Sequence, residues 1–199
     1  MITLYHSPNS RSTRIVGLLK ELDALDRVAI EVVTIQREDG SGARDPRNPH
    51  PDGKVPLLVH DGNLIWESSA IIQYLAELFP EAGLNVPVGD PRRGAYLSWL
   101  AWYAGVVEPV LVLQFLGIDH PGIAKTFRTH DDLKARLAAA LSDRPYLLGD
   151  RYTAADLLLH SPYAWFGKPG VPEIDAWVER CMDRPGARFA AEFDAKHGA

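Results

Sequence analysis

A short segment, from Gly53 to Ile72, combines residue types that could bind a small charged ligand. Glu67 and Ser68 stand where an apolar run gives way to a helical pattern, so we expect them at the start of a helix. The free N–H groups and dipole of a helix start favour a carboxylate, and the Glu67 carboxylate can hold an ammonium group. The residues therefore suit the head group of a free α-amino acid.

Val55 and Pro56 open the apolar run before this helix and offer a second kind of contact. Proline at the first residue of a strand has no N–H for the ladder, so we expect the backbone of Val55 to face outward and to pair with a peptide. A plainer interpretation is that Ser68 or Ser69 only caps the helix and that Pro56 only stiffens a turn. The residue types by themselves leave both interpretations open.

The elements that must position these residues alternate in the first part of the chain. Ile2 to Tyr5 and Val28 to Ile35 have strand character, and a helix is expected to begin near Ser10 between them. A strand-helix-strand unit of this length implies a parallel pair, and Gly53 to Phe79 then adds strand, turn, strand and helix. The order βαβ followed by ββα predicts an α/β thioredoxin-like domain with a mixed sheet in residues 1–80.

The remainder of the chain divides into a linker and a helical region. Residues 81–91 lie in a stretch rich in proline and glycine without periodicity, which predicts a linker. Residues 92–199 are expected to form an all-α domain, with helices at Tyr96 to Leu116, Ile123 to Leu141, Ala154 to Trp165, Ile174 to Met182 and Ala187 to Phe193. In the first domain, the polar stretch Gln36 to Lys54 is expected to form a mobile rim with one turn of helix around Ser41 to Asp45.

Three motifs resemble the cytosolic glutathione transferases. Lys54-Val55-Pro56 followed by Glu67-Ser68 resembles their glutathione-site signature, in which the proline is cis and the Glu-Ser pair grips the γ-glutamyl group. Gly149 to Asp156 resembles their C-terminal capping motif, in which a capping box and a hydrophobic staple serve folding. The resemblance implies glutathione as co-substrate, a small apolar electrophile as second substrate, and a homodimer.

The third motif, Ser7 to Arg14, resembles the Ser-Pro-x-Ser-x-x-x-Arg run of serine-type members such as the phi class, which places the catalytic serine on Ser10. Lowering a thiol pKa from about 8.5 by two units takes about 2.7 kcal/mol, and a hydroxyl hydrogen bond to a thiolate contributes about 1.5–3 kcal/mol. Ser12 is the fallback, and Asn9 or Arg11 could donate instead. Ser10 could also be only the N-cap of the helix.

Further contacts to the two substrates follow from the resemblance. It favours Lys54 as the partner of the glycyl carboxylate of glutathione, while His50 and Arg37 could meet the same group or be solvated charges. His50 departs from the asparagine that is common there in the family. Tyr103 and Val107, on a helix rich in aromatic residues, are the candidates for an apolar pocket that holds the electrophile.

Composition limits the other function classes. A net charge of -5 in 199 residues leaves no basic surplus, which disfavours binding to nucleic acid or to anionic membranes. The N-terminus lacks a signal-peptide pattern, and we expect no stretch of the sequence to be long and apolar enough to approach a membrane span. We therefore expect a cytoplasmic protein. The single cysteine, Cys181, excludes an internal disulfide and is expected in the core. The histidines show no metal-ligand spacing, and we predict no metal.

The sequence thus favours a glutathione transferase that holds glutathione as thiolate and conjugates it to apolar electrophiles. The same site could instead run glutathione-dependent peroxide or disulfide reduction, although a mixed disulfide with the protein is disfavoured because the first loop has no cysteine. A different class of function is a non-catalytic, partner-binding protein on the same fold. The intact signature from Lys54 to Ser68 argues against that class, since a scaffold has no need of an amino-acid site.

Overall fold

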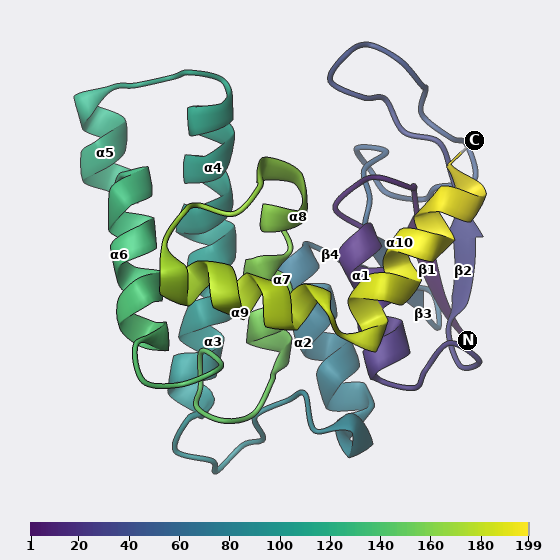
Figure 1. The fold of residues 1–199 in the computed structure, drawn as a ribbon. Helices are drawn as coiled ribbons and strands as arrows, with labels where there is room; N and C mark the ends of the chain where they lie inside the picture. Colours follow the sequence, from purple (N-terminus) through teal and green to yellow (C-terminus); the bar gives the residue numbers. More distant parts are fainter. Residues whose placement is uncertain (199) are drawn as a thin grey trace. The chain divides into compact units, whose positions relative to one another are not determined.

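The computed structural model describes residues 1–198, and its first compact unit combines Met1–Ala82 with the C-terminal segment from Arg184. This unit is built on a four-stranded sheet in the order β2-β1-β3-β4 (Figure 1). The strands are β1 (Ile2–His6), β2 (Ala29–Val32), β3 (Leu57–His60) and β4 (Asn63–Trp66). β1 pairs with β2 in parallel, whereas β1 with β3 and β3 with β4 are antiparallel. The mixed sheet and its thioredoxin-like order confirm the predicted fold class of this part.

Within residues 1–198, the first unit also contains four helical segments. They are α1 (Thr13–Glu21), α2 (Ser68–Leu78), the short 3-10 helix η1 (Pro80–Ala82) and α10 (Pro185–His197). Ile15, Leu18 and Leu19 recur at helical spacing in α1 and are fully buried, which is what an amphipathic helix on a sheet requires. α1 begins three residues after the expected start near Ser10, because residues 8–12 form turns instead.

Helix α10 lies alongside α1 in the first unit (Figure 1). The compact units therefore differ from the expected domains in one place, since we had expected this segment in the helical domain at residues 92–199. The two helices approach closely where Gly17 faces Gly186: a Cβ on Gly186 would lie 2.5 Å from the Gly17 carbonyl oxygen. The Glu21 carboxylate adds polar contacts, accepting from the Gly186 N–H at 2.8 Å and from the Arg184 guanidinium at 2.5 Å.

The strand register brings several loops to one edge of the sheet. Tyr5 lies opposite Leu57, and Leu57 lies opposite Trp66. The end of β1, the start of β3 and the end of β4 are therefore at the same edge. Because β2 runs parallel to β1, with Val32 beside His6, the chain also leaves β2 at this edge.

The loop between β2 and β3 has no helical turn at residues 41–45, so that expectation was wrong. Polar side chains instead accept from backbone N–H groups within and beside this segment: Asp39 accepts from the Ser41 N–H, and Asp45 accepts from the N–H groups of Thr34 and Arg47. Such local side-chain bonds compete with helix formation. The Arg47 guanidinium also holds the Asp45 carboxylate, and the Arg47 side-chain and backbone hydrogen bonds lower the pKa of Asp45.

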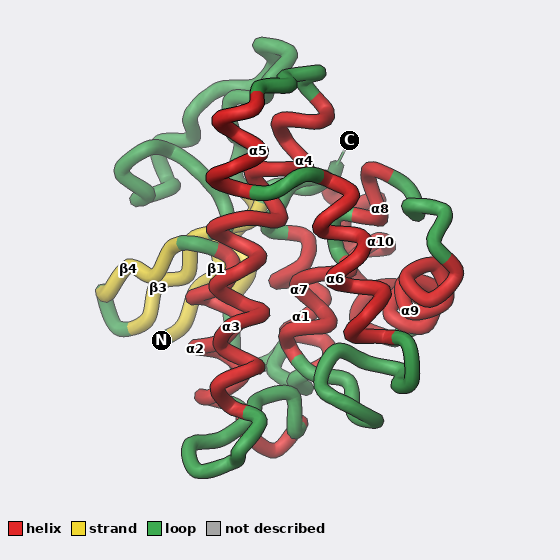
Figure 2. Tube along the Cα trace, turned by 90° about the vertical axis from the view of Figure 1, so that its left-hand side faces the viewer, coloured by secondary structure: helices red, strands yellow, loops and turns green. Residues whose placement is uncertain are grey.

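The second unit, Gly83–Asp183, is helical, as predicted (Figure 2). Its helices are α3 (Arg93–Trp102), the π-helix η2 (Tyr103–Val107), α4 (Glu108–Phe115), α5 (Pro121–Phe127), α6 (His130–Leu141), α7 (Ala154–His160), α8 (Tyr163–Phe166) and α9 (Pro172–Met182). Its core contains the fully buried Trp177 together with Tyr96 and Cys181, and Cys181 lies in the core as expected.

Two predicted helices of this unit are each divided in two. The expected helix at 123–141 breaks at Arg128, whose φ is +89°, and Thr129 then caps α6 by accepting from the Asp132 N–H. The expected helix at 154–165 breaks before Tyr163, where Pro162 has no N–H to continue the hydrogen-bond ladder. Apolar periodicity continues across both breaks, so periodicity alone could not locate them.

The continuous helical run Arg93–Phe115 corrects one further expectation. We expected no segment to approach a membrane span, but this run has 23 residues and a mean hydropathy of 1.4 in its most apolar window. Within the second unit α3 contacts α7, and α4 contacts α6. A core helix of a water-soluble domain has the same length and composition, so these two properties are weak evidence for a membrane span.

Candidate functional site

Ser10 lies in the loop between β1 and α1 and is buried, with 8% of its surface exposed. Its hydroxyl donates to the Ser7 carbonyl oxygen at 2.6 Å and lies 2.7 Å from the Ser12 hydroxyl. The N-cap position of α1 belongs to Ser12, and no side chain caps the helix at that position. The Ser10 hydroxyl oxygen accepts from the Ser12 N–H at 3.2 Å, which is the kind of bond that a helix cap makes, so the interpretation of Ser10 as a cap stays open beside that of a donor.

The neighbouring alternatives, Asn9 and Arg11, are both exposed. Asn9 has φ of +53°, a left-handed conformation that asparagine tolerates better than most residues. Its backbone N–H donates to Oδ2 of Asp194 at 2.6 Å, so this loop is hydrogen-bonded to helix α10. The candidate donor loop is thus fixed by backbone as well as side-chain contacts.

Beneath the loop lie two buried residues that the sequence did not single out, His6 and Asp194. His6 Nδ1 is 2.8 Å from the Ser12 Oγ, and Nε2 is 3.1 Å from Oδ1 of Asp194. The Thr13 hydroxyl donates to Oδ2 of Asp194 at 2.5 Å. Burial by itself raises the pKa of Asp194, but the His6 ring, the Thr13 hydroxyl and the Asn9 N–H outweigh it and hold that pKa below its ordinary value.

The Val55-Pro56 peptide bond is cis, as the resemblance implies. β3 begins at Leu57, one residue later than expected, so Val55 precedes the paired residues of the strand. Pro56 is buried, while Lys54 is exposed and its carbonyl oxygen accepts from the Asn48 side-chain amide at 3.0 Å.

Glu67 and Ser68 stand at the start of α2, at the same edge of the sheet. Glu67 occupies the N-cap position with φ of +68°, and no side chain caps the helix. The alternative in which Ser68 or Ser69 serves only as a cap is thus not what this structure contains. Within residues 1–198, no side chain caps the first-turn N–H groups, and Glu67 is exposed beside them.

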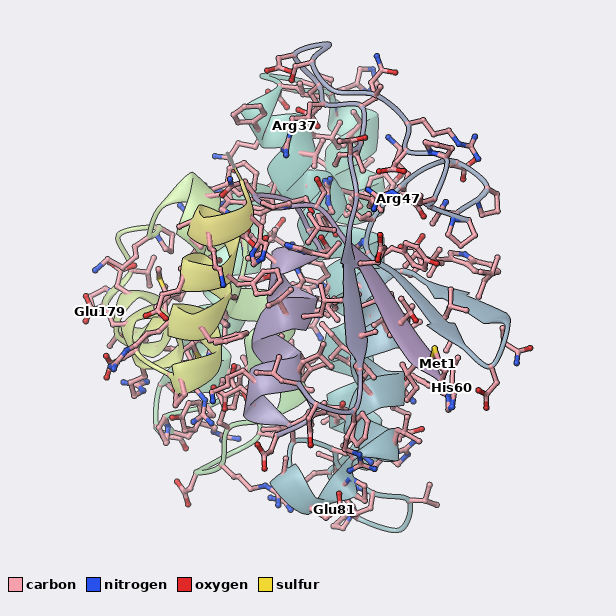
Figure 3. The ribbon with its side chains drawn as sticks, turned by 90° about the vertical axis from the view of Figure 1, so that its right-hand side faces the viewer. Met1, Arg37, Arg47, His60, Glu81 and Glu179 are labelled. Carbon is pink, nitrogen blue, oxygen red and sulfur yellow. The ribbon has the colours of Figure 1, made fainter. Side chains whose placement is uncertain are left out.

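His50 and Arg37 both make contacts within the protein. His50 is buried, and its Nδ1 accepts from the Asp52 N–H at 3.0 Å, which makes it part of the loop's own structure. Arg37, labelled in Figure 3, donates to the carbonyl oxygens of Pro8 at 2.9 Å and Asn9 at 3.3 Å. These bonds brace the loop that carries Ser10.

Tyr103 and Val107 belong to the π-helix η2 of the second unit and are buried, with 1% and 2% exposed. Exposed aromatic surface is found elsewhere in that unit, where Phe115 of α4 and Phe166 of α8 contact each other with ring centroids 5.8 Å apart. Among residues 1–198, no group of three or more His, Cys, Asp or Glu side chains could hold a metal ion.

The structure thus consists of a thioredoxin-like unit and a helical unit. Family profiles agree with this division: "Glutathione S-transferase, N-terminal domain" matches residues 1–83 and "Glutathione S-transferase, C-terminal domain" matches residues 118–185. The chain belongs to the glutathione transferase family.

Individual relatives support the same conclusion. The chain is 29% identical to Glutathione S-transferase 3 of Schizosaccharomyces pombe, covering 96% of this chain and 87% of that protein. It is also 29% identical to Glutathione S-transferase GstA of Escherichia coli O157:H7, covering 82% and 83%. Both relatives are named glutathione S-transferases, and the match covers most of the length of each.

Solved structures extend the match to three dimensions. A glutathione transferase from Methylococcus capsulatus superposes with a TM-score of 0.76 at 29% identity, covering 98% of this chain and 100% of that one. A sphingomonad glutathione S-transferase complexed with glutathione has a TM-score of 0.75 at 25% identity, covering 97% and 98%.

Proposed function

We propose that the protein binds glutathione as its thiolate and transfers it to small apolar electrophiles. The observation that carries the proposal is the strand register, which places Tyr5 opposite Leu57 and Leu57 opposite Trp66. It brings the Ser10 loop, the Val55-Pro56 segment and the uncapped start of α2 to one sheet edge, so a single tripeptide can reach all three.

Each part of glutathione has a suitable partner at this edge. The α-carboxylate suits the first-turn N–H groups of α2 and the Ser68 hydroxyl, while the ammonium suits the exposed Glu67 carboxylate. The cysteinyl backbone can pair with Val55, and Lys54 can meet the glycyl carboxylate. Ser10, in the loop between β1 and α1, can then donate to the sulfur.

The chemical step is a displacement at carbon. The thiolate sulfur supplies the electron pair of the new C–S bond, and a halide or other leaving group departs with the pair of the bond that breaks. One relative, the dichloromethane dehalogenase of Methylorubrum extorquens, is 25% identical over 96% of this chain and is named for a small apolar halide. That name supports electrophiles of this class, and Tyr103 and Val107 remain predictions as pocket residues.

Replacing Ser10 by alanine tests the proposed donor. Glutathione affinity should stay nearly unchanged, but the pKa of the bound thiol should rise by about one to two units toward about 8.5, because a charged hydrogen bond is lost. Activity should fall most near neutral pH and recover as alkali supplies the thiolate. Thiolate absorbance against pH measures the shift.

Ser98→Ala is a matched control, since its hydroxyl also donates to a backbone carbonyl oxygen, that of Gly94 at 2.8 Å, but in α3. An unchanged thiol titration in Ser10→Ala, with a raised pKa on substitution of Asn9 or Arg11, would assign the donor to a neighbour. Assays with aryl halides, peroxides and mixed disulfides distinguish transfer from glutathione-dependent reduction.

A further inference from the structure

A chain of four buried polar side chains runs inward from the candidate thiolate donor. Ser10 Oγ lies 2.7 Å from Ser12 Oγ, which lies 2.8 Å from His6 Nδ1, and Nε2 of the same ring lies 3.1 Å from Asp194 Oδ1. Ser12 and His6 are fully buried, and Asp194 is 4% exposed. We propose that His6 and Asp194 are positioning residues that store the proton of the glutathione thiol, received through Ser10 and Ser12. This inference rests on the proposed function.

The Asp194 carboxylate decides which ring nitrogen of His6 carries a proton. Its Oδ2 accepts from Asn9 and Thr13, and its Oδ1 lies 3.1 Å from His6 Nε2. That contact does not have hydrogen-bond geometry, and among the described residues neither atom has another partner. An ionised carboxylate accepts and cannot donate, so the facing Nε2 carries a hydrogen. In the neutral ring Nδ1 is then an acceptor, and the Ser12 hydroxyl donates to it.

The relay requires one direction in the remaining links. When Ser12 gives its one hydroxyl hydrogen to Nδ1, the 2.7 Å contact between the hydroxyls needs the hydrogen of Ser10. The Ser7 carbonyl oxygen lies 2.6 Å from the Ser10 hydroxyl and 3.2 Å from the Ser12 hydroxyl, so both serines must turn their hydrogens away from it for the relay to run. When Ser10 donates inward, its oxygen presents a lone pair that a thiol S–H can reach.

One proton then moves along each link. The thiol proton passes to Ser10, the Ser10 proton to Ser12, and the Ser12 proton to Nδ1 of His6. The products are a thiolate that accepts from the Ser10 hydroxyl and an imidazolium beside the Asp194 carboxylate, with the total charge unchanged. The carboxylate offsets the cost of a buried cation, as the aspartate does in a Ser-His-Asp triad.

Charged groups also lie on the elements that carry or adjoin the cluster. Asp194 is within ion-pair distance of the His6 ring, and Phe193 contacts both the His6 ring and the His197 ring on α10. The further groups are the buried Arg14 of α1, Arg37 of the β2–β3 loop, which donates to the Pro8 carbonyl oxygen, and Arg47, which donates to the Val32 carbonyl oxygen at the end of β2.

The test counts the protons released when glutathione binds, by calorimetry in buffers of different ionisation enthalpy, alongside thiolate absorbance. The wild-type protein at neutral pH should form thiolate while releasing much less than one proton per thiolate. His6→Asn, which keeps a hydrogen-bonding group near Nδ1 but cannot titrate, should release about one proton per thiolate and raise the pKa of the bound thiol by about one unit.

His60→Asn is the matched control. The His60 ring also has a hydroxyl at Nδ1, that of Tyr74 at 2.6 Å, and a carboxylate near Nε2, that of Asp61 at 3.6 Å, but it lies on β3. It should behave as the wild type. Release of one proton per thiolate by the wild type as well as by His6→Asn would overturn the relay.

A second measurement does not depend on how the His6 variant folds. Nitrogen-15 spectra of the wild-type imidazole should show the neutral form with hydrogen on Nε2, and Asp194→Asn should move it to Nδ1 because an amide can donate to Nε2. Hydrogen on Nδ1 in the neutral wild-type ring would overturn the relay whether or not glutathione binds. Absence of any binding heat would contradict the proposed function, whereas binding with full proton release contradicts the relay alone.

Discussion

Glu67 has φ of +68°, a backbone conformation that residues with a Cβ rarely adopt. Such conformations cost about 1–3 kcal/mol and concentrate at functional sites. Its exposed carboxylate makes no cap to α2, so closing the helix does not account for this conformation, and under the proposed function it would direct the carboxylate to the ligand.

Two substitutions at this residue separate binding from strain. Glu67→Ala should weaken glutathione binding by at least about 1.5 kcal/mol, the scale of a lost charged hydrogen bond, with little effect on stability. Glu67→Gly should weaken binding equally but raise the free energy of unfolding by about 1 kcal/mol, since glycine adopts positive φ without strain. Calorimetry and urea unfolding measure the two effects. Unchanged affinity in both variants would remove Glu67 from the site.

Asp194 should make the free energy of unfolding depend on pH in the acidic range. Because its pKa is lower in the folded than in the unfolded chain, its ionised form stabilises the fold at pH above the unfolded value of about 3.9. That contribution should be lost as pH falls through the lower folded pKa. The stability difference between wild type and Asp194→Asn, from denaturant unfolding, should therefore shrink as the pH falls below about 4. Glu192→Gln, exposed on the same helix, should show no such change.

At the scale of the element, the start of α7 depends on one fully buried carboxylate, as the resemblance to the capping motif implied. Asp156 accepts from the Thr153 N–H at 2.9 Å and hydroxyl at 3.0 Å, from the Leu147 N–H at 2.9 Å and from the Trp177 indole at 3.0 Å. It therefore joins the helix start to the preceding loop and to α9.

Asp156→Asn should lower the free energy of unfolding by about 3 kcal/mol, because an amide nitrogen would face buried donors. Asp132→Asn is the matched control: Asp132 makes the same two bonds to Thr129, at 2.9 and 2.8 Å, but at an exposed helix start. It should cost about 1 kcal/mol or less. Equal losses from denaturant unfolding would show that the buried contacts of Asp156 add nothing.

At the scale of the whole molecule, the homodimer remains a prediction from the resemblance. Light scattering at micromolar concentration should give twice the chain mass of 22.0 kDa. Because the net charge is -5, repulsion between subunits should weaken association at low salt, so the measurement needs physiological ionic strength. A monomer under those conditions would contradict the prediction.

The sequence by itself determined what depends on neighbours along the chain. Apolar spacing predicted the strand-helix order and the helical second unit, and Thr153 with Asp156 predicted a capping box because its partners are three residues apart. The signature from Lys54 to Ser68 indicated the family and the cis bond before Pro56. Helix breaks at Arg128 and Pro162 were missed, because the apolar period continues through them.

Only the tertiary structure decided which distant residues meet. His6 and Asp194 stand at opposite ends of the chain, and no spacing in the sequence relates a strand end to a C-terminal helix. They are brought together because glycines at 17 and 186 let α10 approach α1, and because parallel pairing of β1 with β2 fixes where β1 ends. Hydrogen-bond direction in the Ser10 loop depends on that contact, so the chemistry proposed for the loop rests on packing between segments that are distant in sequence.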